Sequence, residues 1–202
     1  MESLVRIDLD GMIARGERIV VDLGCGSRKK PGRVGIDKVD LEGVDIVADL
    51  EKGLSFFPAG CVDEIHCRSV LEHVDDLEGL LAEMLRVLKP EGTAHVFVPH
   101  FSNPHFYSDY THRRFFGLYT FYYFVEPARQ LKRKVPNYYS SVRIRILSLR
   151  LVFRSTFKFF NPLKKAYGRL INLHPRLQEW YEENLCYSVP CHGIEVVFTR
   201  DV

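Results

Sequence analysis

The stretch that decides the fold is Val20-Val21-Asp22-Leu23-Gly24-Cys25-Gly26, at residues 20–26. Its first part is apolar and β-branched, which is typical of a buried strand. Two glycines one residue apart follow directly, and glycine permits a tight turn whose backbone approaches a ligand closely. Because ligands of open α/β sheets lie beyond the carboxyl ends of the strands, this turn is the first candidate binding site.

Three carboxylates stand at the ends of the first three predicted strands, which span residues 18–23, 34–37 and 44–49: Asp22, Asp37 and Asp49. A carboxylate after the second strand can accept two hydrogen bonds from a ribose diol. A single aspartate in such a place is more often a turn or capping residue. Three aspartates at successive strand ends, the first directly before a glycine turn, favour a binding site.

The rest of the chain alternates between strand and helix patterns. Apolar residues three and four apart predict a helix over 75–89, with Asp75 or Asp76 as N-cap and residues 90–92 as its stop. Further strands are predicted at 62–67, 93–98, 142–153 and 193–200, with helical spacing between 156 and 185. This order predicts an α/β domain with a mostly parallel sheet and an antiparallel C-terminal strand.

The 202 residues fit a single domain over 1–202, in which segments 100–140 and 155–190 are insertions that form a lid over the carboxyl end of the sheet. The chain has no run of eighteen apolar residues, so we expect no transmembrane segment. It begins without a secretion-signal pattern, and its five cysteines are irregularly spaced. These features favour a cytoplasmic protein with reduced thiols.

The charge distribution is strongly asymmetric. Residues 127–178 contain thirteen Lys or Arg and no Asp or Glu, so the other 150 residues carry a net −11 against a total of +2. A block of this kind attracts anions such as an acidic substrate, a lipid surface or a nucleic acid. It can equally dock on the acidic part of the same chain or of a second copy, as in a homodimer.

Several short motifs in order give this sequence a family resemblance. They are D-L-G-C-G at 22–26, G-I-D at 35–37, V-A-D-L at 47–50, S-V-L-E-H-V at 69–74, R-V-L-K-P-E-G at 86–92 and V-P-H at 98–100. Together they resemble the class I S-adenosylmethionine-dependent methyltransferases, in particular the type-11-like branch. The resemblance covers residues 20–101 and implies a three-layer Rossmann-like methyltransferase sheet.

The resemblance also implies a cofactor, S-adenosylmethionine, and a set of residues around it. Gly24 and Gly26 of the Asp22–Gly26 loop, which includes Cys25, would pass beneath its methionine part. Asp37 would hold the ribose hydroxyls, and Asp49 with Leu50 would meet the adenine. Arg68 and Ser69 would flank the methionine and the reacting methyl group.

Two features depart from the family pattern. Ser27 replaces the third glycine, and the connections after the first two strands are shorter than the dozen residues of an ordinary parallel crossover. The helices there are expected to be reduced to loops, which leaves one face of the sheet open to a partner chain.

An oxygen or nitrogen acceptor can require a base to take its proton. The candidates follow the fifth strand: His112 first and His100 second, with Asp109 three residues before His112 as an orienting carboxylate. Such histidines can also serve only as hydrogen-bonding groups in an aromatic loop. Some related methyltransferases bind a divalent ion through E-x-x-E-H, but here only Glu72-His73 of that motif remains, so no metal is expected.

The resulting prediction is a methyltransferase that acts on a small or lipid-linked anionic acceptor by O- or N-methylation. One alternative is an RNA methyltransferase that uses the basic segment 127–178. Another is a non-catalytic scaffold subunit that binds the cofactor. A third is peripheral membrane binding through residues 157–170, where Phe and Leu lie opposite Lys158, Lys164, Lys165 and Arg169.

Overall fold

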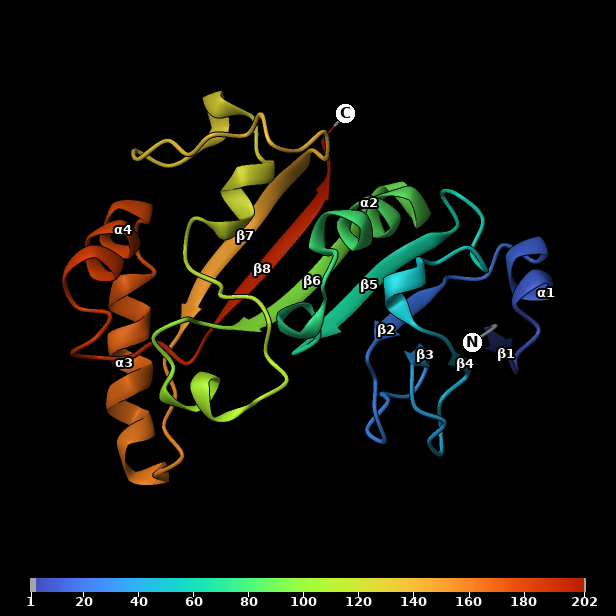
Figure 1. The fold of residues 1–202 in the computed structure, drawn as a ribbon, viewed down its shortest axis with the longest axis horizontal. Coiled ribbons are helices and arrows are strands. Elements are labelled where there is room, and N and C mark those ends of the chain that lie inside the picture. The colour runs from blue at the N-terminus through green and yellow to red at the C-terminus, as the bar shows by residue number, and fades with distance from the viewer. Residues whose placement is uncertain (1–2, 202) are drawn as a thin grey trace.

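The computed structural model describes residues 3–201 and is organised around one eight-stranded sheet with the order β1-β4-β3-β2-β5-β6-β8-β7 (Figure 1). The strands are β1 (Leu4–Val5), β2 (Val20–Leu23), β3 (Val34–Asp37), β4 (Ile46–Val47), β5 (Val62–Arg68), β6 (Leu88–Pro99), β7 (Ile144–Val152) and β8 (Gly193–Arg200). The α-helices are α1 (Leu9–Ala14), α2 (Leu77–Val87), α3 (Asn161–Ile171) and α4 (Pro175–Asn184). Six short 3-10 helices complete the set: η1 (Leu50–Lys52), η2 (Leu71–His73), η3 (Pro104–Ser108), η4 (Thr120–Phe124), η5 (Pro127–Arg129) and η6 (Lys158–Phe160).

The strand directions confirm the predicted Rossmann-like methyltransferase sheet with an antiparallel C-terminal strand. Strands β4, β3, β2, β5 and β6 pair in parallel, whereas β8 is antiparallel to both β6 and β7. The first short strand, β1, adds an antiparallel edge beside β4 that the sequence patterns did not predict. No helix within residues 3–201 is long and apolar enough to cross a membrane.

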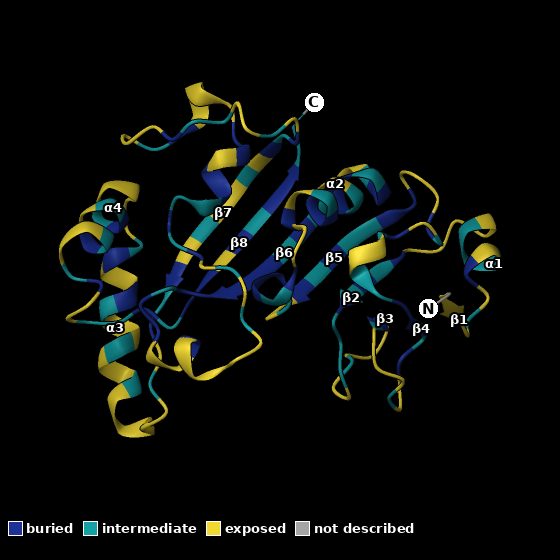
Figure 2. Cartoon of the chain, viewed as in Figure 1, coloured by how far each residue is buried: buried dark blue, intermediate teal, exposed yellow. Residues whose placement is uncertain are grey.

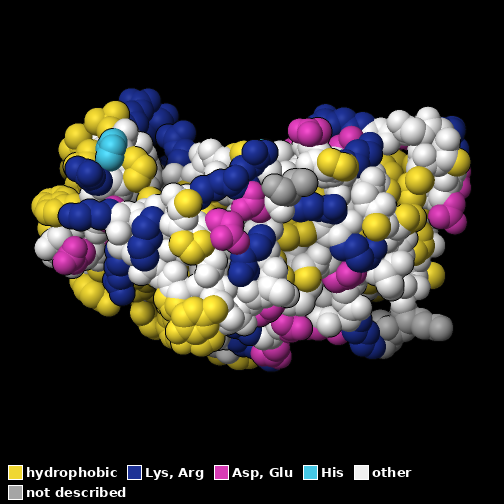
Figure 3. Space-filling model, turned by 90° about the horizontal axis from the view of Figure 1, so that it is seen from above, with side chains coloured by type: hydrophobic (Ala, Val, Ile, Leu, Met, Phe, Trp, Pro, Cys, Tyr) yellow, Lys and Arg dark blue, Asp and Glu magenta, His cyan; other side chains and the backbone are white. Residues whose placement is uncertain are grey.

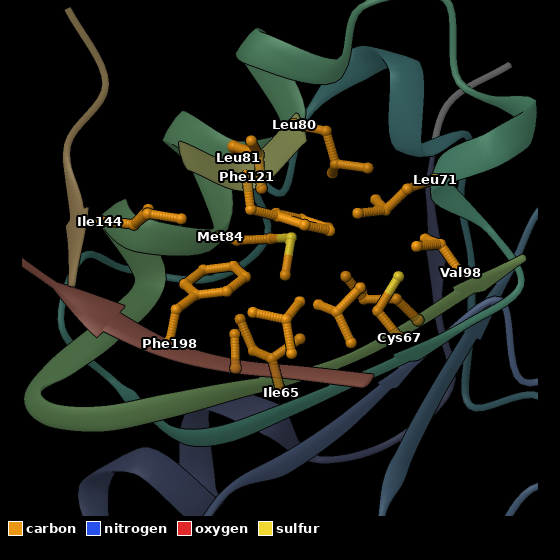
Figure 4. Packing of buried hydrophobic residues seen from close by; sticks show 14 of the residues in the cluster. Ile65, Cys67, Leu71, Leu80, Leu81, Met84, Val98, Phe121, Ile144 and Phe198 are labelled. Carbon is orange, nitrogen blue, oxygen red and sulfur yellow. The ribbon is translucent and has the colours of Figure 1, made fainter. Parts of the chain in front are cut away.

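The hydrophobic core lies between the sheet and α2, on the side of the sheet from which Ile65 and Cys67 project (Figure 4). Leu81 and Met84 of α2 are fully buried against it, as the apolar spacing predicts. The helix begins where Asp76 accepts a hydrogen bond from the Gly79 N–H at 2.9 Å. Buried residues concentrate in the central strands and exposed ones along the outer helices (Figure 2).

Two predicted boundaries were wrong. The helix ends at Val87, and residues 90–92 lie inside β6, because the buried Leu88 already pairs with Val62 of β5. The helical pattern over 156–185 is divided into η6, α3 and α4. The division falls at His174, whose extended backbone (φ −151°, ψ 142°) is the conformation favoured before Pro175.

The connections at residues 24–33 and 38–45 contain no helix, as their length predicts. Lys29 holds them together by donating to both carboxylate oxygens of Asp45, at 2.8 and 2.7 Å. On the side of the sheet opposite the core, a groove of about 520 Å³ is therefore open, and Asp22, His66 and His95 line it.

The two C-terminal helices protect the free edge of the sheet. The side-chain amide of Asn172, just after α3, pairs with the Leu151 backbone: its oxygen accepts from the N–H and its nitrogen donates to the C=O, each at 2.8 Å. Gln178 of α4 donates to the Leu149 carbonyl. These amides take the place of a neighbouring strand along residues 149–151, which shortens the edge of β7 that another chain could pair with. All five cysteines are free thiols.

Candidate active site

The glycine turn after β2 is closed by backbone hydrogen bonds to the neighbouring strand. The Gly24 N–H donates to the Ile36 carbonyl at 2.8 Å, and Gly24 has a φ of +64°. A Cβ at Gly24 would lie 2.3 Å from a methyl carbon of Val70. Glycine is therefore required at position 24 for two reasons: its backbone conformation and the close approach of Val70.

Asp37, at the end of β3, ties this turn to the next loop. One carboxylate oxygen accepts the Gly26 N–H at 2.9 Å, and the other accepts the Val39 N–H at 3.0 Å. Each oxygen keeps a second lone pair for another donor. Asp37 can thus hold the turn and still accept hydrogen bonds from a ligand.

A cavity of about 200 Å³ opens beyond the carboxyl ends of β2, β3 and β5. Of the residues predicted to hold the cofactor, it is lined by Gly24, Asp37, Asp49, Leu50 and Ser69. The cavity wall is completed by Lys38, Glu51, Val70, His73 and Val74.

Asp22 and Cys25 do not line this cavity. Side chains alternate along β2, so Leu23 enters the core while Asp22 faces the open groove on the other side of the sheet. Cys25 lines the same groove, and burial raises the pKa of its thiol to about 11. Their predicted cofactor contacts receive no support from this geometry.

A second hollow of about 280 Å³ adjoins the cavity and shares Ser69 and His73 with it. Arg68 lies at its rim, with its guanidinium 4.0 Å from the centre of the Phe97 ring. Four histidines line it: His73, His105, His112 and His192. Proton-accepting groups therefore gather next to the predicted cofactor cavity.

Glu72 is the most perturbed carboxyl group of this hollow. Its side chain is 1% exposed, and within residues 3–201 its Oε2 has no hydrogen-bond partner. Burial raises its pKa to about 7; hydrogen bonds from its own amide and from Ser69 oppose the rise, and the nearby Asp109 adds to it. Strongly shifted groups in a hollow are typical of functional sites.

This pKa predicts a stability change with pH. Because the folded-state pKa of Glu72 lies above its ordinary value, the folded protein loses stability as pH rises toward and past 7. Glu72→Gln removes the buried charge, so we expect it to raise the free energy of unfolding by about 2 kcal/mol at pH 8 and to change it little at pH 5. Urea denaturation of both proteins at the two pH values measures this. A gain of equal size at pH 5 would contradict the assignment.

His112 is held in one orientation beside Glu72. Its Nδ1 lies 2.8 Å from the Phe106 carbonyl, which can only accept, so the neutral ring carries its proton on Nδ1 and its lone pair on Nε2. Asp109 Oδ2 lies 3.6 Å from that Nε2. The predicted pair of His112 and Asp109 thus lies together at the hollow. Nε2 of His112 can take a proton there, and the Asp109 carboxylate is close enough to stabilise the resulting charge.

His100 lies elsewhere. Its ring is fully buried, with Nδ1 2.8 Å from the Ser102 hydroxyl and Nε2 2.9 Å from Glu182 of α4. It lines neither the cavity nor the hollow. In this fold both ring nitrogens of His100 are engaged in joining the end of β6 to α4.

Glu72, His73 and His112 each place a possible ligand atom within 4.8 Å of the other two. The first carboxylate of the related metal-binding motif is Ser69 in this chain, which leaves one hard oxygen ligand in the group. The absence of a metal therefore stays a prediction.

A basic groove of about 470 Å³ continues from the hollow, with which it shares Asn103, His105 and His192. Its cations are Arg154, Lys158 and Lys164. His192 was not among the site residues predicted from the sequence. It directly precedes the antiparallel strand β8, which begins at the edge where the parallel strands end, and this topology is the signal that would have placed it.

The sheet order, the glycine turn and the cavity beside it define the class I methyltransferase fold. Residues 21–96 match the family described as "Methyltransferase domain". This match spans less than half of the chain and supports a class I S-adenosylmethionine-dependent methyltransferase, with S-adenosylmethionine as its cofactor.

Solved structures support the fold at low sequence identity. A methyltransferase from Archaeoglobus fulgidus described as "SAM dependent" is similar with a TM-score of 0.60 and 18% identity, over 95% of this chain and 94% of that one. The YcgJ protein from Bacillus subtilis gives 0.50 and 16%, over 96% and 98%. The [4+2]-cyclase SpnF gives 0.52 and 16%, over 96% and 81%. No curated protein matches the chain significantly.

The residues of the cavity fit this cofactor. Asp37 has lone pairs available for ribose hydroxyls, and Leu50, Val70 and Val74 offer apolar surface for an adenine ring. The missing Cβ of Gly24 lets the chain pass close to the cavity wall at Val70.

Proposed function

We propose that this methyltransferase methylates an oxygen or nitrogen atom of a small or lipid-linked anionic acceptor. The acceptor's nucleophile would lie in the hollow beside His112, and its anionic group in the basic groove. The observation that carries the proposal is continuity: the cofactor cavity shares residues with the hollow, and the hollow shares residues with the groove.

When bound, S-adenosylmethionine supplies an electrophilic methyl group on its sulfonium. Nε2 of His112 would take the proton of the acceptor's nucleophile as that atom gains the methyl group, and S-adenosylhomocysteine would leave. Asp109 stabilises the imidazolium that results. The chain otherwise contributes geometry, because an in-line displacement depends on approach and on exclusion of water.

The segments that we expected to form a lid supply the acceptor side of this site. Asn103, His105 and Phe106 enter the hollow from segment 100–140, together with Asp109 and His112. Segment 155–190 supplies Lys158 and Lys164 to the groove. This placement supports their proposed role in enclosing the acceptor.

The basic groove gives a direct test of the acceptor's charge. Lys164→Ala should raise the KM for an anionic acceptor about tenfold, since an ionic contact is lost, and should leave the Kd of S-adenosylmethionine unchanged. Lys132→Ala is the matched control, because it removes a cation from the same basic segment but lies outside the groove. Equal KM changes in both variants would contradict an acceptor site in the groove.

The identifying experiment combines calorimetry with turnover. We expect the purified protein to bind S-adenosylmethionine and to produce S-adenosylhomocysteine only with acceptors that carry a phosphate or carboxylate. An RNA acceptor would instead show an affinity that falls steeply with salt. Turnover on RNA alone, with that salt dependence, would overturn the proposal.

A further inference from the structure

The segment from η6 through α3 exposes a row of large apolar side chains. Phe159 is 88% exposed and Leu163 is 71% exposed. Leu163, Ala166 and Leu170 are three and four residues apart, so they lie along one face of α3. This exposed set, called here the apolar stripe, comprises Phe157, Phe159, Phe160, Leu163, Leu170 and Leu173.

The stripe is not part of the protein core. A different face of α3 attaches to the body of the protein through Gly168 and Ile171, both buried. A Cβ at Gly168 would lie 3.0 Å from the Phe153 ring, so this contact is close. The helix is therefore fixed in place while the stripe points outward.

The charge on the segment that carries the stripe has one sign. Lys158, Lys165 and Arg169 are exposed on the same segment, and residues 127–178 contain no acidic residue. Two of the three glutamates of the following helix are engaged by neighbouring groups: Glu179 accepts from Tyr119 and Glu182 contacts His100. The third, Glu183, is exposed. Hydrophobic and basic side chains crowd together at the end of the molecule where α3 and α4 lie (Figures 1 and 3).

We propose that the apolar stripe docks the protein on the surface of an anionic lipid bilayer. Exposed apolar side chains flanked by cations can enter the boundary between headgroups and acyl chains while the cations meet lipid phosphates. Three members of the stripe are leucines, which have no ring to stack on a nucleic-acid base, so the composition favours lipid over single-stranded RNA.

The position of the stripe connects docking to the active site. Phe157 and Lys158 also line the basic groove, opposite Pro104 and His105 of η3. In Figure 1 the η6 end of the orange α3 and the green η3 lie toward the same lower edge of the molecule. A docked protein would thus present its groove to lipid headgroups. This step rests on the proposed function and makes the acceptor lipid-borne, whereas the docking itself does not depend on it.

Co-sedimentation with vesicles tests the docking. We expect the full chain to pellet with vesicles of phosphatidylglycerol and phosphatidylcholine mixed equally, and to stay in the supernatant with phosphatidylcholine alone. Phe159→Ser combined with Leu163→Gln should weaken binding to the anionic vesicles at least about tenfold. Lys165→Glu combined with Arg169→Glu should do the same through charge.

Matched controls alter similar side chains elsewhere. Tyr138→Ser with Tyr139→Ser removes two exposed aromatic rings outside the stripe, and Lys132→Glu with Lys134→Glu reverses two cations outside α3. Both controls should bind vesicles as the unaltered chain does. Calorimetry with S-adenosylmethionine should give unchanged affinity for all four double variants, which shows that each is folded.

Three results would overturn the docking proposal. The first is equal pelleting with neutral and anionic vesicles. The second is equal loss in the controls and in the stripe variants. The third is a dimer, by light scattering, that Phe159→Ser with Leu163→Gln converts to monomer while the unaltered chain ignores vesicles, since a second copy then covers the stripe. Vesicle binding without turnover on any lipid would leave docking intact and count against the proposed acceptor alone.

Discussion

Gly24→Ala is expected to lower the affinity for S-adenosylmethionine at least about a hundredfold and to destabilise the fold by about 2 to 4 kcal/mol. The new methyl group would lie 2.3 Å from Val70 Cγ2, and the backbone φ of +64° is itself costly for alanine. Relief of the contact must move Val70 or the turn, and both border the cofactor cavity. Calorimetry and urea denaturation measure the two effects.

Two further variants separate the contact from the backbone strain. Gly60→Ala imposes a similar φ of +68° with no atom within 4 Å of the new Cβ, away from the cavity. It should cost about 1 kcal/mol and leave cofactor affinity unchanged. Adding Val70→Ala to Gly24→Ala should recover part of the affinity because the clash is removed. Full affinity in Gly24→Ala alone would show that the cofactor does not use this turn.

The strands were predictable wherever local signals mark both ends. The strand at residues 34–37 and the strand at 193–200 have the bounds that the sequence predicts, because glycine or a carboxylate stands at their limits. The boundary between α2 and β6 was not predictable in this way. It depends on the pairing of Leu88 with Val62, a contact between distant residues that overrides the local Pro-Glu-Gly signal.

The site was predictable to the extent that it lies at strand ends. Five of the predicted cofactor residues line one cavity because the carboxyl ends of neighbouring parallel strands meet at one edge. The alternation of side chains along β2 already implies that Asp22 faces away from Leu23 and from the core. The role of His100 could not be inferred, because its partner Glu182 is 82 residues away in the chain.

His112→Asn is expected to lower kcat by about a hundred- to a thousandfold while the Kd of S-adenosylmethionine stays unchanged. Asparagine keeps a polar side chain of similar reach, but it cannot take the proton of the nucleophile at Nε2. Asp109→Asn should cost about tenfold, because it leaves the base in place and removes only the charge that stabilises the imidazolium. Rates at saturating acceptor and calorimetry of cofactor binding give both numbers.

A pH series and a chelator distinguish a base from a metal ligand at this position. If His112 is the base, raising the pH should partly restore the rate of His112→Asn, since hydroxide and the ionised acceptor take over the missing proton transfer. The unaltered enzyme should then work equally well in EDTA. Loss of activity in EDTA that Mg²⁺ or Zn²⁺ restores would show instead that Glu72, His73 and His112 hold an ion, because their ligand atoms already lie within 4.8 Å of one another. Under that outcome the proton acceptor would have to be sought among His105 and His192, the other histidines of the hollow.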